Sequence, residues 1–86
     1  QPTGTFQIPY RLNQSGYMAR GWIFDLSGRK VALIADNTSL GTQGYLEWNG
    51  KGRDGSPVNT GIYIIYLELW HPGGNVIRKK QVLLIP

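Results

Sequence analysis

Residues 48–66 read WNGKGRDGSPVNTGIYIIY, and this stretch decides the fold. A tryptophan-bearing segment runs into a polar, glycine-dense loop, and the loop leads into a long run of β-branched and aromatic residues. Glycine, asparagine and aspartate favour tight turns, whereas β-branched and aromatic side chains favour strands. The stretch therefore predicts a strand, a turn-rich loop and a second strand, with the other segments pairing with or packing on this unit.

The segment from residue 61 to residue 70 has the strongest strand pattern in the chain. Apolar residues occupy both alternating sets of positions, which are Tyr63, Ile65, Leu67 and Leu69 in one set and Ile62, Ile64, Tyr66 and Trp70 in the other. A strand that is apolar on both faces is typical of the middle of a sheet.

A shorter strand over residues 45–49 places Leu46 and Trp48 on one face. We expect Trp48 to be the largest core residue, since a buried indole removes on the order of 150–250 Å² of surface from water. The core therefore forms between this short strand and the long strand at 61–70.

Two further strands are predicted ahead of this unit. In residues 5–12 the apolar positions alternate with others, and Pro9, which has no backbone N–H, places the segment at a sheet edge or at a switch between sheets. In residues 17–25 one face carries small residues, which suit the close approach of another layer, so this face is expected to point inward. Its residues are Tyr17, Ala19, Gly21 and Ile23. Trp22 and Phe24 then point outward.

The rest of the chain is assigned from turn signals and alternation. The predicted segments are a hairpin connection at 25–29, a strand at 30–35, a polar loop at 36–44, a short extra strand at 56–58 and a last strand at 76–84. Val31 and Leu33 are expected in the core. Six or seven strands with frequent turn signals and no helical period predict an all-β antiparallel sandwich or a small barrel.

Length and composition limit the domain organisation. The chain has 86 residues, which is enough for one domain, and we assign residues 1–4 to a linker end and residues 5–86 to the domain. It has no cysteine, so neither a disulfide nor a thiolate metal site is available to it. It also shows no apolar run long enough for a membrane span and no signal-like start. Because it does not begin with methionine, we expect it to be a piece of a longer protein.

The ionisable side chains do not form a catalytic set. The carboxylates Asp25, Asp36, Glu47, Asp54 and Glu68 lie in separate turns and strands. Glu47 and Glu68 are the pair to consider for glycoside hydrolysis, but both are expected to point to solvent. His71 is the only histidine, and a single histidine makes neither a triad nor a metal site. We therefore expect no enzymatic activity and no cofactor.

The polar loop at residues 49–55 was considered as an ion site. Calcium requires several carboxylates, whereas this loop offers Asp54 alone, beside Lys51 and Arg53. A phosphate-binding loop requires a following helix, whereas a strand is predicted here. Turn formation is the favoured role of the loop.

The charge pattern favours solvated strand faces over a nucleic-acid partner. The formal net charge is +4, and its basic residues are spread along the chain apart from Arg78, Lys79 and Lys80. A short basic run on a predicted strand is more typical of a solvent-facing edge than of a phosphate-binding patch. No nucleic-acid partner is expected.

Two motifs, in this order, resemble those of the FlgD-like immunoglobulin-like domains. The first is the hairpin at 23–31, IFDLSGRKV, and the second spans 48–63. The matching positions are Asp25, Gly28, Arg29, Trp48, Asn49, Gly50, Asp54, Gly55, Pro57, Gly61 and Tyr63. Asn49 stands where the family usually has aspartate, and Lys51 and Arg53 add positive charge where acidic residues are frequent. The resemblance covers residues 6–84.

This resemblance implies an Ig-like antiparallel β-sandwich of six to seven strands at the C-terminal end of an exported, multidomain bacterial protein. It further implies a non-catalytic role as a spacer, a docking module or a domain read by the type IX secretion machinery. The location would be secreted or at the cell surface. The partners would be the preceding domains of the chain, the secretion machinery or another surface protein.

A surplus of apolar residues points to an interaction surface. If the core takes one face of the strands at 17–25 and 61–70, the opposite face carries Trp22, Phe24, Ile64, Tyr66 and Trp70. A monomer rarely exposes an apolar patch larger than a few hundred Å². Either loops or the first strand cover part of this patch, or the faces are assigned wrongly. Otherwise the patch is an interface with a preceding domain, a partner protein or a second copy. Stacking on sugar rings is the alternative function.

Overall fold

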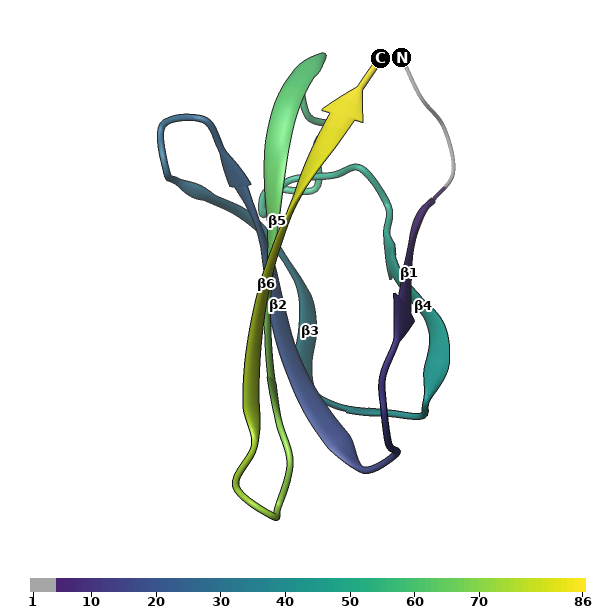
Figure 1. Ribbon diagram of the computed structural model, residues 1–86. Coiled ribbons are helices and arrows are strands. Elements are labelled where there is room, and N and C mark those ends of the chain that lie inside the picture. Colours follow the sequence, from purple (N-terminus) through teal and green to yellow (C-terminus); the bar gives the residue numbers. More distant parts are fainter. Residues whose placement is uncertain (1–4) are drawn as a thin grey trace.

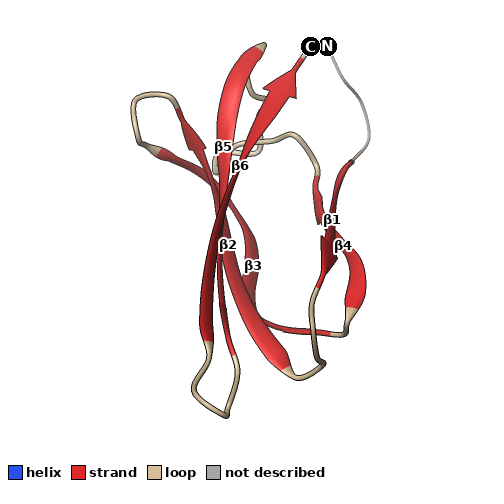
Figure 2. Ribbon diagram, in the orientation of Figure 1, coloured by secondary structure: helices blue, strands red, loops and turns tan. Residues whose placement is uncertain are grey.

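Residues 5–86 fold into strands joined by turns, without a helix, in a computed structural model (Figures 1 and 2). The strands are β1 (Phe6–Arg11), β2 (Tyr17–Asp25), β3 (Lys30–Leu40), β4 (Gln43–Trp48), β5 (Gly61–Trp70) and β6 (Val76–Ile85). The linker end predicted at residues 1–4 lies outside the described residues. In the part of the chain that the structure describes, there is no helix of the length and apolarity needed to span a membrane.

The strands form two facing antiparallel sheets (Figure 1). The small sheet has the order β1-β4, and the large sheet has the order β3-β2-β5-β6. The predicted Ig-like antiparallel sandwich is therefore confirmed, with six strands rather than seven. β5 lies between β2 and β6, as its two apolar faces predict. β1 pairs with β4 alone among the described strands, which is the edge position predicted from Pro9.

The core lies between the two sheets and is built around Trp48, whose side chain is 3% exposed. Its ring centroid lies 5.9 Å from that of Phe6 in β1 and 6.1 Å from that of Tyr63 in β5. Its Nε1–H donates to the carbonyl of Lys51 at 3.0 Å, so the polar atom of the indole is satisfied. The prediction that Trp48 is the main core residue is confirmed. At the far end of the chain, Ile85 is also fully buried.

The inner face of β2 is the one predicted. Tyr17, Ala19, Gly21 and Ile23 are buried, but the space at Gly21 is filled by side chains of β3 and β5 in the same sheet rather than by another layer. A Cβ atom at Gly21 would lie 2.6 Å from Leu67 Cδ2 and 3.1 Å from Ile34 Cγ1. The position therefore accepts glycine because neighbouring core side chains already fill the space above it.

β3 differs from the prediction in length. The segment expected to be a polar loop from residue 36 continues as a strand to Leu40, and its pairs with β2 include Tyr17↔Leu40 and Ala19↔Thr38. Asp36, Asn37 and Ser39 are exposed and Thr38 is half-buried, and Asn37 has a positive φ of 50° where the pairing register shifts. These features give the segment the composition of a loop although its backbone pairs as a strand.

The core residues of β3 were predicted correctly only in part: Val31 packs against the core, whereas Leu33 does not enter it. Ala32 and Ala35 are buried, whereas Leu33 is 53% exposed and Val31 is half-buried. Register shifts interrupt the β2–β3 pairing, and an irregularity of this kind breaks the strict alternation of side chains. The extra strand predicted at residues 56–58 is absent too; the loop forms an isolated bridge between Lys51 and Pro57 instead.

The crowding at Gly21 generates a stability prediction. Gly21→Ala is expected to lower the free energy of unfolding by about 1–3 kcal/mol, because the new methyl group overpacks a filled core. Urea denaturation followed by tryptophan fluorescence measures this. Gly41→Ala is the matched control, since a Cβ there meets nothing within 4 Å. Equal stabilities of the two variants would contradict the prediction.

Candidate interaction surface

The two sequence motifs meet at one end of the sandwich. Asp25, at the end of β2, pairs across the sheet with Tyr63 in β5. Both residues line a hollow of about 230 Å³ together with Asp54, Pro57 and other residues of the loop between β4 and β5. Motif residues that are far apart in the sequence thus form one continuous structural unit.

Asp25 organises the turn between β2 and β3. Its Oδ1 accepts hydrogen bonds from the Ser27 amide at 2.9 Å, the Ser27 hydroxyl at 2.6 Å and the Arg29 amide at 3.0 Å. The bond from the Ser27 hydroxyl, followed by that from the Arg29 amide, lowers the pKa of the Asp25 carboxyl below its ordinary value of 3.8. Gly28 supplies the positive φ of 90° that the turn requires. All of these hydrogen bonds lie within residues 25–29, so the turn is stabilised by its own residues.

The loop between β4 and β5 is held by its own polar groups. Asn49 Oδ1 accepts from the Lys51 amide at 3.0 Å, and Asp54 Oδ1 accepts from the Ser56 amide at 2.9 Å. Gly50 and Gly55 have positive φ values of 77° and 84°. Among residues 5–86, no three histidine or acidic side chains are grouped as metal ligands. Asp54 thus has the turn role favoured from the sequence.

The end of this loop is tied to β5. The Tyr63 hydroxyl donates to the Asn59 carbonyl at 2.8 Å, while its ring packs edge-on against Trp48 at an interplanar angle of 62°. Gly61 opens β5 opposite Ile85. The motif residues that resemble the FlgD-like family therefore make turns and core contacts.

The outer face of the large sheet carries a row of aromatic rings. Trp22 in β2 stacks on its cross-strand neighbour Tyr66 in β5, with centroids 6.1 Å apart and planes at 21°. Phe24 meets Tyr66 edge-on at 6.4 Å and 70°. All three side chains are half-buried although no layer covers this face among the described residues. Packing among the rings themselves removes part of their surface from water.

Two cations cover aromatic rings on the same face. Lys30 Nζ lies 4.8 Å from the Trp22 ring, and Arg20 Cζ lies 5.6 Å from the Trp70 ring. Such contacts contribute about 0.5–1 kcal/mol each at exposed sites. Because Lys30 and Tyr66 belong to the strands on either side of β2, the ring of Trp22 is contacted from both sides.

A hollow of about 550 Å³ lies beside the aromatic row and is lined by Phe24, Leu26, Ile64, Tyr66 and Lys80, among others. Exposed apolar side chains lie on the same face: Leu26, which lines the hollow, is 69% exposed, and Val82 and Leu84 of β6 are 65% and 66% exposed. Val82 lies directly opposite Ile64 in the β5–β6 register. We name Trp22, Phe24, Leu26, Ile64, Tyr66, Val82 and Leu84 the outer patch.

The outer patch agrees in part with the residues predicted from the sequence. The structure brings Trp22, Phe24, Ile64 and Tyr66 together, whereas Trp70 lies further along β5 beyond Glu68. Leu26, Val82 and Leu84 were not predicted. The signal available for two of them was the alternation of β6, which places Val82 and Leu84 on one face, opposite Ile64 and Ile62.

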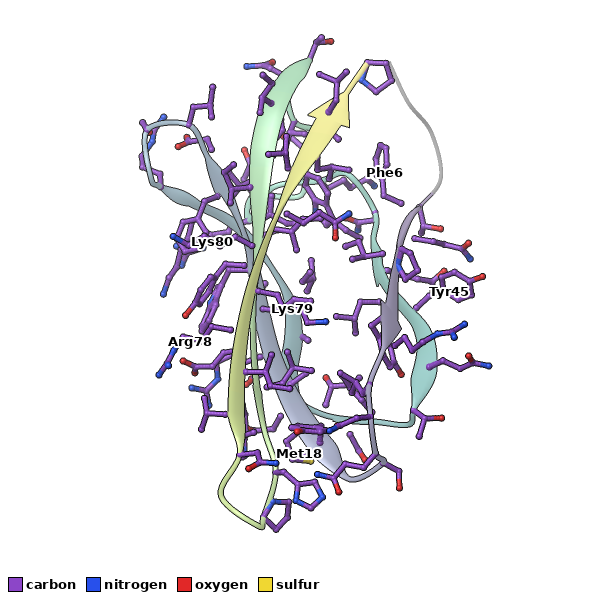
Figure 3. The ribbon with its side chains drawn as sticks, viewed as in Figure 1. Phe6, Met18, Tyr45, Arg78, Lys79 and Lys80 are labelled. Carbon is purple, nitrogen blue, oxygen red and sulfur yellow. The ribbon has the colours of Figure 1, made fainter. Side chains whose placement is uncertain are left out.

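Glu47 and Glu68, the two carboxylates compared with a glycosidase pair, lie on different sheets. Glu68 Oε2 lies 3.4 Å from Arg78 Nε on the outer face of the large sheet, whereas Glu47 is exposed on β4 of the small sheet. Figure 3 shows Arg78 and Lys80 on the side of the large sheet that faces away from β4, and Lys79 on the other side. The basic run therefore does not form one patch.

His71 has a structural role that the sequence did not reveal. The Gly73 amide donates to its Nδ1 at 3.0 Å, so Nε2 carries the proton and donates to the Ser15 carbonyl at 3.2 Å. Its ring also packs edge-on against Tyr17 at 5.2 Å. His71 thus links the β5–β6 turn to the β1–β2 turn.

No model of a known protein family matches this sequence, and no curated protein matches it either. The membership in the FlgD-like group consequently stays a prediction from the two motifs.

The geometry of the Asp25 turn predicts a change in titration. Ser27→Ala is expected to raise the pKa of the Asp25 carboxyl toward 3.8, because the hydroxyl that most stabilises the carboxylate is removed. An NMR titration of the carboxyl carbon measures this. Ser39→Ala, an exposed serine in β3, is the control and should leave the titration unchanged.

The same turn should affect stability against pH. The folded pKa of Asp25 is lowered, so its stabilising effect is present above the unfolded pKa and is lost as the pH falls through the folded pKa. Asp25→Asn should thus be less stable than the parent protein near neutral pH, with a difference that shrinks below about pH 4. Urea denaturation at several pH values tests this, and a constant difference would refute it.

Proposed function

We propose that this domain is a non-catalytic interaction module of an exported bacterial surface protein, and that it docks a polypeptide on the outer patch. The observation that carries the proposal is the apolar continuity of the patch across β2, β5 and β6, with Val82 and Leu84 each about two-thirds exposed. Exposed apolar surface of this kind is typical of sites that bind another protein surface.

The chemistry of the outer patch favours a polypeptide partner. Trp22, Phe24 and Tyr66 supply aromatic anchors, and the hollow beside them is lined mainly by apolar side chains with Lys80 at its rim. Buried aromatic anchors surrounded by a polar rim are typical of protein interfaces. The proposed partners are the preceding domains of the same chain, another surface protein, or a second copy of this domain.

Carbohydrate binding is the weaker alternative. Stacking of a sugar requires an aromatic ring with one face free toward solvent, whereas Trp22 is contacted by Tyr66 and Lys30, and Trp70 lies under Arg20. A sugar would first have to displace a cation from its ring. The alternative is retained because these rings are only half-buried.

Docking on the outer patch predicts where cross-links form. With a photoreactive amino acid at Val82 of the full-length protein in its native host, a polypeptide cross-link is expected, because the side chain would lie inside the interface. Tyr45 is the matched control: it is 62% exposed and lies on the small sheet. Equal cross-linking at both positions, or none at either, would contradict docking on this face.

The secretion role makes a separate prediction. A reporter fused ahead of the domain should be exported by a host that has type IX secretion, because the folded module would serve as the sorting signal. Fractionation of the culture measures this. A reporter retained in the periplasm would eliminate the sorting role and leave the docking role standing.

Affinity electrophoresis against a panel of polysaccharides tests the alternative. A glycan-binding domain should be retarded by at least one polysaccharide, and Tyr66→Ala should restore its mobility. Unchanged mobility of the parent domain in every gel would remove carbohydrate binding.

A further inference from the structure

The small sheet leaves one side of the sandwich open. It has two strands and faces a sheet of four, and β1 pairs with no second strand among residues 5–86. β4 continues directly from β3, so the chain itself closes the side where β3 and β4 lie. The open side lies between the free edge of β1 and β6, the edge strand of the large sheet (Figure 1).

The backbone groups on the free edge of β1 follow from the ladder. The Leu12 amide donates to the Thr42 carbonyl at 2.7 Å, in the register that joins β1 to β4. Because antiparallel bonding alternates along a strand, even-numbered residues of β1 bond to β4 and odd-numbered residues point to the free edge. Gln7 and Arg11 thus offer both N–H and C=O groups there, and Pro9 offers its C=O.

A groove runs beside this edge. It has a volume of about 300 Å³ and is lined by Pro9, Tyr10, Ile65, Leu67, Lys79 and Gln81, among others. Ile65 and Leu67 are buried core residues, whereas Lys79 and Gln81 share their face of the sheet, through the β5–β6 register, and stay exposed. The groove thus has apolar residues, Ile65 and Leu67, at its base and the Lys79 ammonium at its rim, and it lies next to the unpaired backbone groups of β1.

We propose that the free edge of β1 accepts an extended segment of a partner polypeptide, which adds a third strand to the small sheet. Its backbone would bond to Gln7, Pro9 and Arg11, and its alternate side chains would face Lys79 and Gln81, the exposed residues of β6 beside the buried Ile65 and Leu67. Lys79 requires an acidic residue opposite it, so the segment carries negative charge. Because the rest of the groove is lined largely by apolar side chains, the other inward positions of the segment are apolar. Strand addition of this kind gains affinity from main-chain bonds and specificity from the side-chain pockets.

Electrostatic repulsion disfavours a second copy of this domain as the strand that pairs with β1. Pairing two copies edge to edge brings Lys79 and Lys80 of one molecule toward those of the other, and each molecule carries a net charge of +4. Proline at an edge and an inward-facing charge are also devices by which proteins avoid unlimited strand pairing. Pro9 removes one donor, and a segment without an acid would cover the Lys79 ammonium at a cost in desolvation, so the edge favours a restricted set of strands.

The test uses synthetic peptides and does not depend on the outer patch. The probe alternates valine and threonine, with glutamate in place of the central valine; a second peptide carries lysine at that position. Amide exchange followed by NMR should show that the glutamate peptide slows exchange of the Gln7 and Arg11 amides. The glutamate peptide should bind about tenfold more tightly than the lysine peptide, as opposite charges at a close pair require.

Two controls isolate the two parts of the interaction. N-methylation of the probe at the amides facing β1 should abolish binding, because it removes the ladder donors without any change to the protein. Lys79→Glu should reverse the preference between the two peptides. Lys51→Glu makes the same charge change on an exposed loop and should leave the preference unchanged.

The outcomes separate the proposal from its competitors. Unaltered exchange at Gln7 and Arg11, or equal binding of the N-methylated probe, would show that the edge is merely protected and would overturn the proposal. Shifts confined to Trp22 and Tyr66 would assign the peptide to the outer patch and overturn it as well. Sedimentation of the free domain as a dimer through β1 would replace the partner segment with a second copy.

Discussion

The burial of the Trp48 indole is the interaction on which the rest of the structure depends. One side chain contacts Phe6 of β1 and Tyr63 of β5, and its N–H holds the loop after β4 through the Lys51 carbonyl. Loss of a buried tryptophan side chain costs about 3–5 kcal/mol, against a typical total stability of about 5–15 kcal/mol. The chain has no disulfide, so the small sheet is held over the large one by core packing, to which the Trp48–Tyr63 contact contributes.

The position of this core explains the outer patch. The sandwich has one interior, and the inner faces of β2 and β5 fill it with Ile23, Ile65, Leu69 and their neighbours. The apolar residues at the intervening positions have no interior left to enter. They pack on one another and under cations instead, which leaves a cohesive apolar surface on the outside of the large sheet.

The sequence predicted those parts of the fold in which alternation is strict. The two faces of β2 and β5 and the burial of Trp48 follow from a period of two residues, and the edge position of β1 follows from Pro9. β3 was not predicted correctly because register shifts and the positive φ of Asn37 interrupt its pattern. Local pattern carries no information on such an irregularity, since it depends on how the neighbouring strand is placed.

The candidate sites show the same division. Trp22, Phe24, Ile64 and Tyr66 were foreseen because they occupy one face of adjacent strands. The contributions of Val82 and Lys79 depend on the register of β6 and on the width of the small sheet, which are properties of the assembled sandwich, whereas Leu26 lies in the turn after β2, outside any alternating pattern. His71 likewise gains its role from Ser15, a residue in a different turn.

The burial of Ile85 governs when the domain reaches its native state during synthesis. Its side chain is fully enclosed, and it pairs with Gly61, the first residue of β5. Before residues 76–85 emerge from the ribosome, β5 lacks its neighbour on one side, and the interior position of Ile85 is filled last. Native packing must therefore await the end of this segment, and until then the nascent chain exposes apolar surface that chaperones can bind.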